Sequence, residues 1–169
     1  SAPADTNQWI IFRKVVNVTG DPAKNFVKIA ADSKYWLWVN GELEVFEGGL
    51  KRGPNHTDTY VDNVKLKNLK KGENTIAVLV WYYGRQGFSH RSSGTAGLYF
   101  DMTVGGKHYV GDKTWKTKMH PAYYTPAGEL PNYRLPESNI GFNAQKDISD
   151  FYTVGYDDSS WENAGEIDL

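Results

Sequence analysis

Residue types that hold a sugar gather in two stretches of this chain, at residues 51–60 and 81–93. The stretches read KRGPNHTDTY and WYYGRQGFSHRSS. Sugar C–H faces pack on aromatic rings, and Asn, Asp and Arg side chains bond the hydroxyls. Together the two stretches predict a carbohydrate site at one end of a fold that brings them together. Its candidate residues are Arg52, Asn55, Asp58, Trp81, Tyr83, Arg85 and His90.

A second interpretation of the same aromatic residues is structural. Trp81 and Tyr83 lie two positions apart and therefore share one face of an extended strand. Trp36 and Trp38 share a face in the same way. Such pairs fill a core or contact a neighbouring domain as readily as they hold a sugar. Both interpretations stay open at this point.

The dipeptide Ser89-His90 has the residue types of a nucleophile next to its base. Neighbouring residues on an extended chain point to opposite faces, and a nucleophile usually meets its base from a distant sequence position. Glycoside hydrolysis needs two carboxyl groups about 5 to 9.5 Å apart, and no spacing among the 20 acidic residues singles out such a pair. We therefore predict no catalytic residues in this chain.

The sequence contains only weak signals for a metal-binding or phosphate-binding site. The four histidines do not pair at helical spacing, so the zinc-protease pattern is absent. EGGLKRG, residues 47–53, is rich in glycine but leads into no helix that would bind phosphate. Asp32, Asp58 and Asp62 have the oxygen ligands that Ca²⁺ prefers, although turn formation is the more common role of such residues. Ca²⁺ is the one candidate cofactor.

Length and composition bound the class of protein. The chain has 169 residues, which suits one domain with a core, and a formal net charge of −1. It has no cysteine, which excludes disulfides and Cys-based zinc sites. Lys and Arg are scattered, and no stretch approaches the roughly 20 apolar residues of a membrane span. We expect neither a nucleic acid nor a membrane as partner.

Alternating apolar residues and turn signals predict at least seven short strands. Asn40-Gly41 and Gly105-Gly106 are hairpin signals, and residues 73–83 are apolar on both faces, as in a central strand. A single helical turn is expected within residues 68–74. The predicted strands are residues 9–18, 25–31, 35–47 as a hairpin, 57–66, 73–83, 96–110 as a hairpin, and 114–119. This pattern predicts an all-β antiparallel sandwich or barrel.

The composition of the chain changes along its length, which predicts three segments. Residues 1–8 are expected to be a disordered start or a cloning remnant, and residues 9–120 the β-sandwich domain. Residues 121–169 contain four of the seven prolines. We expect this segment to cross the surface of the sandwich and to lead to a downstream domain.

The order of motifs resembles a known family. WIIFRK is followed by YWLWVNGELEVFE, then KGENTIAVLVWYY, TWKTK and YDDSSWENA. From Trp9 to about Ala164 the chain resembles the N-terminal, non-catalytic β-sandwich of bacterial α-L-rhamnosidases of glycoside hydrolase family 78. The resemblance implies a jelly-roll sandwich of galactose-binding-like topology, in a periplasmic or extracellular bacterial enzyme. It also implies that a separate, C-terminal (α/α)6 barrel carries out catalysis.

The resemblance therefore implies an ancillary domain that is not an enzyme alone. Its expected role is scaffolding, together with binding of a rhamnose-containing carbohydrate. The alternative is a purely structural or protein-interaction domain, in which Trp36, Trp38 and residues 121–136 pack on the missing downstream domains. A third interpretation, an enzyme with an unrecognised site, would need a pocket with two facing carboxyls.

Overall fold

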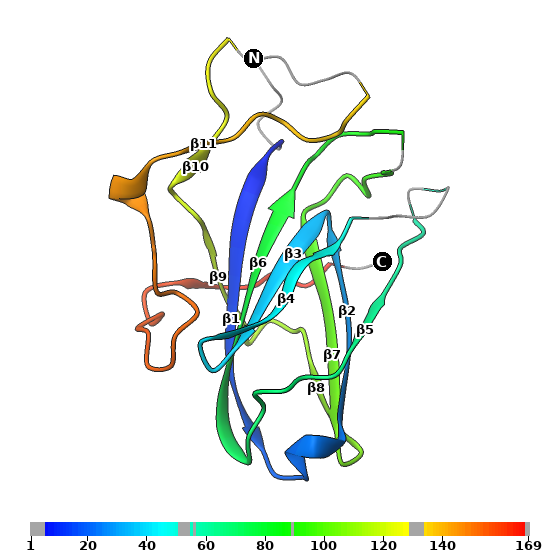
Figure 1. The fold of residues 1–169 in the computed structure, drawn as a ribbon, viewed down its shortest axis with the longest axis vertical. Helices are drawn as coiled ribbons and strands as arrows, with labels where there is room; N and C mark the ends of the chain where they lie inside the picture. The colour runs from blue at the N-terminus through cyan, green and yellow to red at the C-terminus, as the bar shows by residue number, and fades with distance from the viewer. Residues whose placement is uncertain (1–5, 51–54, 56, 89, 129–133, 168–169) are drawn as a thin grey trace.

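The structure, a computed structural model, describes residues 6–50, 55, 57–88, 90–128 and 134–167. These residues form an all-β fold of antiparallel strands, which confirms the predicted fold class (Figure 1). The strands are β1 (Gln8–Val18), β2 (Asn25–Asp32), β3 (Lys34–Val39), β4 (Glu42–Gly49), β5 (Asp62–Val64), β6 (Gly72–Tyr82), β7 (Gly97–Val104), β8 (Lys107–Val110), β9 (Lys116–Met119), β10 (Tyr123–Tyr124), β11 (Gly141–Phe142) and β12 (Glu162–Asn163). Short 3₁₀ turns lie at Pro22–Lys24 and Ala144–Lys146.

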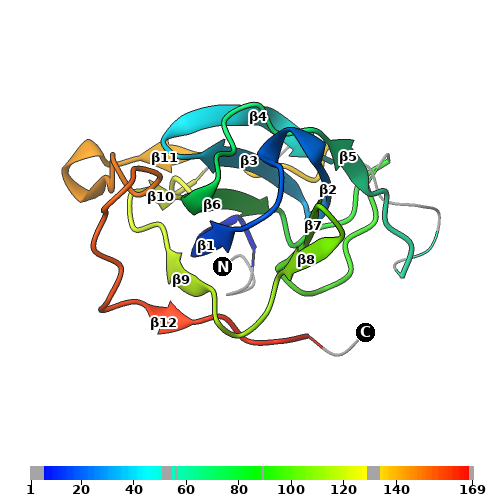
Figure 2. The same ribbon diagram turned by 90° about the horizontal axis from the view of Figure 1, so that it is seen from below.

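Two sheets make the sandwich. One has six strands in the order β12-β9-β1-β6-β3-β4, and the other has four in the order β5-β2-β7-β8. A small β10-β11 pair stands apart from both sheets. Seen end-on in Figure 2, the four-stranded sheet lies on one side of the six-stranded sheet and the β10–β11 segment lies on the other. The six-stranded sheet is therefore the middle layer.

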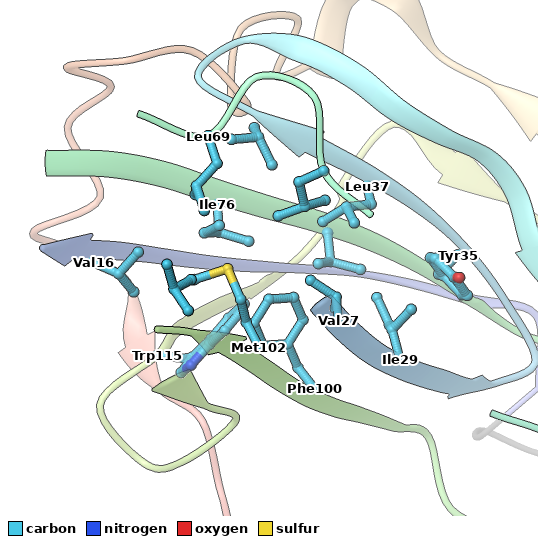
Figure 3. Close-up of a cluster of buried hydrophobic side chains, with 14 of the residues drawn as sticks. Val16, Val27, Ile29, Tyr35, Leu37, Leu69, Ile76, Phe100, Met102 and Trp115 are labelled. Atoms are coloured by element: carbon cyan, nitrogen blue, oxygen red, sulfur yellow. The ribbon is translucent and has the colours of Figure 1, made fainter. Parts of the chain in front are cut away.

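The main core fills the space between the two sheets. Alternate residues of β1, β2, β3, β6 and β7 point into it, as the period of two along a strand requires. Figure 3 shows Ile76 and Leu37 on one side of this core and Ile29, Phe100 and Met102 on the other. The predicted inward alternation of these strands is thus observed.

The opposite face of the six-stranded sheet is also buried. Phe151 and Trp161, from the segment after β9, form a second buried cluster there with residues of β1 and β6, which include Trp9, Leu79 and Trp81. Residues of β6 are accordingly buried on both faces, as the sequence predicts for a central strand. No helix in the described ranges is long and apolar enough to cross a membrane.

Two sequence predictions about local structure are wrong. The expected helical turn in residues 68–74 does not form. Residues 68–71 are irregular chain, residues 72–74 begin β6, and the Asn74 side chain bonds the carbonyls of Lys70 and Gly72. The expected strand over residues 57–66 is reduced to β5. Tyr60 is 51% exposed, whereas Leu66 is buried.

Both chain-terminal segments contact the sandwich. Asn7, within the expected disordered start, accepts a hydrogen bond from Trp81 Nε1 at 2.8 Å and donates one to Thr125 Oγ1 at 2.8 Å. Beyond β9 the chain crosses the outer face and returns as β12 to pair with β9. The division of the chain at residue 120 and the jelly-roll strand order stay predictions.

Candidate functional site

The two aromatic residues predicted to stack on a sugar are buried. Trp81 is 7% exposed and Tyr83 is 0% exposed. Trp81 stacks on Trp9 with ring centroids 4.7 Å apart and meets Tyr83 edge-on at 4.7 Å. Both rings are therefore largely covered by neighbouring residues. Their role in stacking on a sugar stays a prediction. Burial also raises the pKa of Tyr83 above its ordinary value, with Glu137 adding to the shift.

The polar candidates separate into different places. Asn55 and Asp58 form their own turn, in which Asn55 Nδ2 donates to Asp58 Oδ2 at 3.0 Å. Arg85 is half-buried at the start of the loop after β6. Arg52 lies outside the described residues. A sugar-binding role for these side chains stays a prediction.

His90 connects the loop after β6 to the residue that follows β4. Its Nδ1 lies 2.9 Å from the carbonyl oxygen of Leu50, at the end of β4. Since a carbonyl only accepts, Nδ1 carries the proton that is donated. Leu50, which directly follows β4, and the loop after β6 are therefore adjacent in space. The predicted meeting of residues 51–60 with residues 81–93 stays a prediction.

The other face of His90 meets a buried carboxylate and a hydroxyl. His90 Nε2 lies 3.4 Å from Asp32 Oδ1 and 3.2 Å from Ser33 Oγ. Ser33 Oγ in turn donates to Asp32 Oδ1 at 2.9 Å. These three side chains are at most 3% exposed. We call Asp32, Ser33, His90, Ser92 and Ser93 the Asp32 cluster.

Hydrogen bonds dominate the electrostatics of the Asp32 cluster. Burial alone would raise the pKa of Asp32. Hydrogen bonds from His90, from the amide and hydroxyl of Ser93, and from Ser33 outweigh it and lower the pKa to about 2. Asp32 is therefore ionised at neutral pH, deep in the fold.

The Asp32 cluster has the residue types of a hydrolytic triad without its geometry. In such a triad the carboxylate and the nucleophile bond opposite ring nitrogens of the histidine. Here both Asp32 and Ser33 lie at Nε2, while a backbone carbonyl occupies Nδ1. The arrangement connects the loop after β6 to the β2–β3 connection by hydrogen bonds and so has a structural role. Sequence reasoning missed it because its members come from separate segments with no motif.

Calcium does not fit the three aspartates suggested for it. Both oxygens of Asp32 accept hydrogen bonds inside the Asp32 cluster. Asp62 Oδ2 accepts from Tyr35 Oη at 2.7 Å and from the Gly49 amide at 2.9 Å. Asp58 bonds Asn55 in a separate turn. In the described chain no three His, Asp or Glu side chains are grouped to hold a metal ion.

A row of aromatic rings crosses the outer face of the six-stranded sheet. Trp9 stacks on Tyr123 at 4.0 Å and on Trp36 at 5.6 Å, and Trp36 meets Phe46 edge-on at 6.3 Å. Phe46, at one end of this row, is 70% exposed. Trp38 is instead covered by Phe151 and Tyr152 of the same chain. Trp36 therefore lies beside an exposed ring that a partner domain could contact. Trp38 is already covered by residues of its own chain.

Comparisons with known proteins give the class of domain. No protein-family model and no curated protein sequence matches the chain. Among solved structures, a family 78 rhamnosidase of Bacillus sp. GL1 superposes with a TM-score of 0.77 at 25% identity. The match covers 94% of this chain and 16% of that enzyme. An α-L-rhamnosidase of Aspergillus terreus gives 0.71 at 20% identity, over 100% of this chain and 20% of the enzyme.

A lectin of Pleurotus ostreatus is also similar in fold. It superposes with a TM-score of 0.53 at 16% identity, over 94% of this chain and 37% of the lectin. The chain spans a fifth or less of the two rhamnosidases. The resemblance to one β-sandwich domain of family 78 α-L-rhamnosidases, inferred from sequence motifs, is confirmed by these superpositions, and the lectin fits the galactose-binding-like class.

Proposed function

We propose that this chain is an ancillary, non-catalytic β-sandwich of an α-L-rhamnosidase-like glycoside hydrolase, with binding of a rhamnose-containing carbohydrate as a second role. The observation that carries the proposal is the superposition of 94% of the chain on 16% of a family 78 rhamnosidase. A match of this kind is expected for one domain of a larger enzyme. The partners would be the remaining domains of that enzyme, and its location the bacterial periplasm or exterior.

Catalysis is assigned elsewhere in the enzyme. A glycosidase needs two carboxyl groups facing each other across a sugar. In the described chain the most buried carboxylate, Asp32, is engaged by hydrogen bonds to its own neighbours. This supports the absence of hydrolytic activity from the isolated chain.

A purely structural domain is the alternative, and the exposed aromatic residues favour it. Phe46 stands out from the outer face beside Trp36, and Tyr124 and Phe142 on β10–β11 are each about half exposed. Apolar side chains exposed in this way are common at domain contacts. Under this alternative the outer face would be covered in the full-length protein.

Titration with L-rhamnose, with and without Ca²⁺, separates the two functions. Isothermal calorimetry on the chain should give saturable heat if it binds the sugar. A flat response up to tens of millimolar, weaker than the about −4 kcal/mol of a millimolar complex, would support the structural alternative. An assay of the same sample on an aryl α-L-rhamnoside should show no hydrolysis, and turnover would refute the non-catalytic assignment.

A further inference from the structure

Two surface segments that are far apart in sequence are held at their bases by one buried dipeptide. The first segment is Gly49-Leu50, the last residue of β4 and the residue that follows it, which we call the β4 exit. The second is the loop after β6, described at residues 83–88 and 90–96. The dipeptide is Asp32-Ser33, whose residues are 3% and 0% exposed. Its hydrogen bonds are therefore shielded from water.

Ser33 bonds both segments with different polar groups. Its carbonyl accepts from the Leu50 amide at 2.9 Å, and its hydroxyl accepts from the Tyr83 amide at 3.1 Å. Its amide donates to the Trp81 carbonyl at 3.0 Å, near the end of β6. Gly49 packs so closely on Ser33 that a Cβ at Gly49 would lie 2.9 Å from the Ser33 carbonyl oxygen. A displacement of Ser33 would therefore break contacts to both segments.

The carboxylate of Asp32 holds the later part of the loop after β6. Its Oδ2 accepts from the Ser93 amide at 2.7 Å, from the Ser93 hydroxyl at 2.8 Å and from the Ser92 hydroxyl at 3.1 Å. Its Oδ1 accepts from the Ser33 hydroxyl at 2.9 Å. One carboxylate thus joins Ser92 and Ser93 to the residue that bonds the β4 exit.

His90 completes a closed path of hydrogen bonds between the two segments. Its Nδ1 donates to the Leu50 carbonyl at 2.9 Å, while its Nε2 lies 3.2 Å from Ser33 Oγ. The β4 exit is therefore held twice, through the Leu50 amide by Ser33 and through the Leu50 carbonyl by the loop after β6. His90 is 1% exposed, so water cannot readily replace these bonds.

The network has few independent ways to open. Breaking one of its bonds leaves a buried donor or acceptor unpaired, which is costly where the local dielectric constant is low. Moving the loop after β6 away from Asp32 and Ser33 also removes His90 from the Leu50 carbonyl. Local openings of proteins occur in contiguous cooperative units. The contacts therefore favour one joint opening over two separate openings.

We propose that the β4 exit and the loop after β6 form one cooperative unit, joined by Asp32 and Ser33, so that the two segments open and close together. Whatever stabilises one segment then also stabilises the other, because their openings break the same hydrogen bonds. This coupling does not depend on sugar binding and holds equally in a purely structural domain. It gives Asp32 and Ser33 a role in coupling two surface segments.

Hydrogen–deuterium exchange followed by NMR tests this coupling on the whole chain. The amides of Leu50, Tyr83 and Ser93 should have similar protection, since one opening exposes all three. They should exchange faster than the amide of Val78, in the fully buried middle of β6, which needs global unfolding. Ser93→Ala removes a hydroxyl that bonds Asp32. It should speed the exchange of Leu50 by about tenfold, the size expected for one hydrogen bond to a charged group.

Thr95→Ala is the matched control in the same loop. The hydrogen bonds between Thr95 and Ser93 use only the backbone amide and carbonyl of Thr95, so this change should leave Leu50 exchange unaltered. Acceleration of Leu50 in Ser93→Ala but not in Thr95→Ala supports the cooperative unit. If only the amides of the loop after β6 respond, the two segments open separately and the coupling is refuted. Leu50 protection equal to that of Val78 in the unsubstituted chain would also refute it, since no local unit would then open.

Discussion

Arg13 Nη1 lies 3.3 Å from Asp158 Oδ2, which joins the middle of β1 to the far end of the chain. The guanidinium also donates from Nε to the Phe151 carbonyl at 2.8 Å and from Nη2 to the Thr153 carbonyl at 3.2 Å. Arg13 is 1% exposed, and burial lowers its pKa while Asp158 opposes that change. A single buried cation thus fastens residues 151–158 over the aromatic face of the six-stranded sheet.

Replacing Arg13 should detach this covering segment. Arg13→Ala leaves carbonyls and a carboxylate without their donor, and we expect it to lower the free energy of unfolding by about 3 to 5 kcal/mol. Lys14→Ala is the matched control, because Lys14 Nζ only bonds the exposed Thr114, and should change stability by about 0.5 kcal/mol or less. Urea unfolding measures both. Similar values for the two variants would contradict the anchoring role.

Acid should weaken the Asp32 cluster. The pKa of Asp32 is about 2 in the folded protein, against an ordinary value of 3.8. Because the pKa of Asp32 is lower in the folded protein than in the unfolded chain, the ionised carboxylate stabilises the fold by about 2 kcal/mol at pH values above the unfolded pKa. This contribution is lost as the pH falls from about 4 to about 2. Asp32→Asn should therefore be less stable at pH 6 but show a flatter dependence between pH 4 and 2. Parallel curves for the two proteins in that window would refute this coupling.

The strands were predictable because their signals are local. Alternation of apolar residues located β1, β2, β6 and β7 to within a residue or two at each end. Asn40 and Gly41 both have positive φ, 52° and 83°, as the Asn-Gly hairpin signal requires. Such features depend on neighbours in sequence. The prediction of a strand over residues 57–66 was wrong because side chains elsewhere in the chain determine their conformation. Asn25, 41 positions away, bonds the backbone of Leu66.

The candidate site was less predictable for the same reason. The sequence of a Trp-rich strand end is the same whether its rings bind a sugar or pack against a distant segment of the same chain. Trp81 is buried in a cluster that also contains Phe151 and Trp161 from the segment after β9, and no local pattern in the sequence shows that this segment returns across the sheet. The Asp32 cluster likewise joins segments separated by dozens of residues. His90 was singled out in advance as a sugar-binding candidate and Asp32 as a possible Ca²⁺ ligand, but their contact with each other was not predicted.

His120 should stay neutral to a lower pH than an ordinary histidine. Burial lowers its pKa below 6.5, and Asp147, 3.4 Å from Nε2, opposes this shift without cancelling it. Its Nδ1 accepts a hydrogen bond from the Ala122 amide at 3.3 Å, which requires that nitrogen to be unprotonated. The folded pKa lies below the unfolded one, so this contribution to stability is present above about pH 6.5 and is lost as pH falls through the folded pKa.

An NMR titration of the His120 ring measures that pKa directly. Asp147→Asn removes the opposing charge and should lower the pKa further. A midpoint at or above 6.5 in the unsubstituted protein, or an upward shift in Asp147→Asn, would contradict the dominance of burial.

The buried ring of Tyr35 leaves no room for a side chain at position 48, which is glycine. Tyr35 is 0% exposed and its hydroxyl donates to Asp62 at 2.7 Å. A Cβ at Gly48 would collide with this ring, and the ring is held from both ends. Gly48→Ala should therefore lower the free energy of unfolding by about 1 to 3 kcal/mol, the usual effect of overpacking. Gly165→Ala is the control, since no atom lies within 4 Å of a Cβ there. Thermal unfolding of the two variants should differ by several degrees, and equal melting temperatures would show that Tyr35 can move aside.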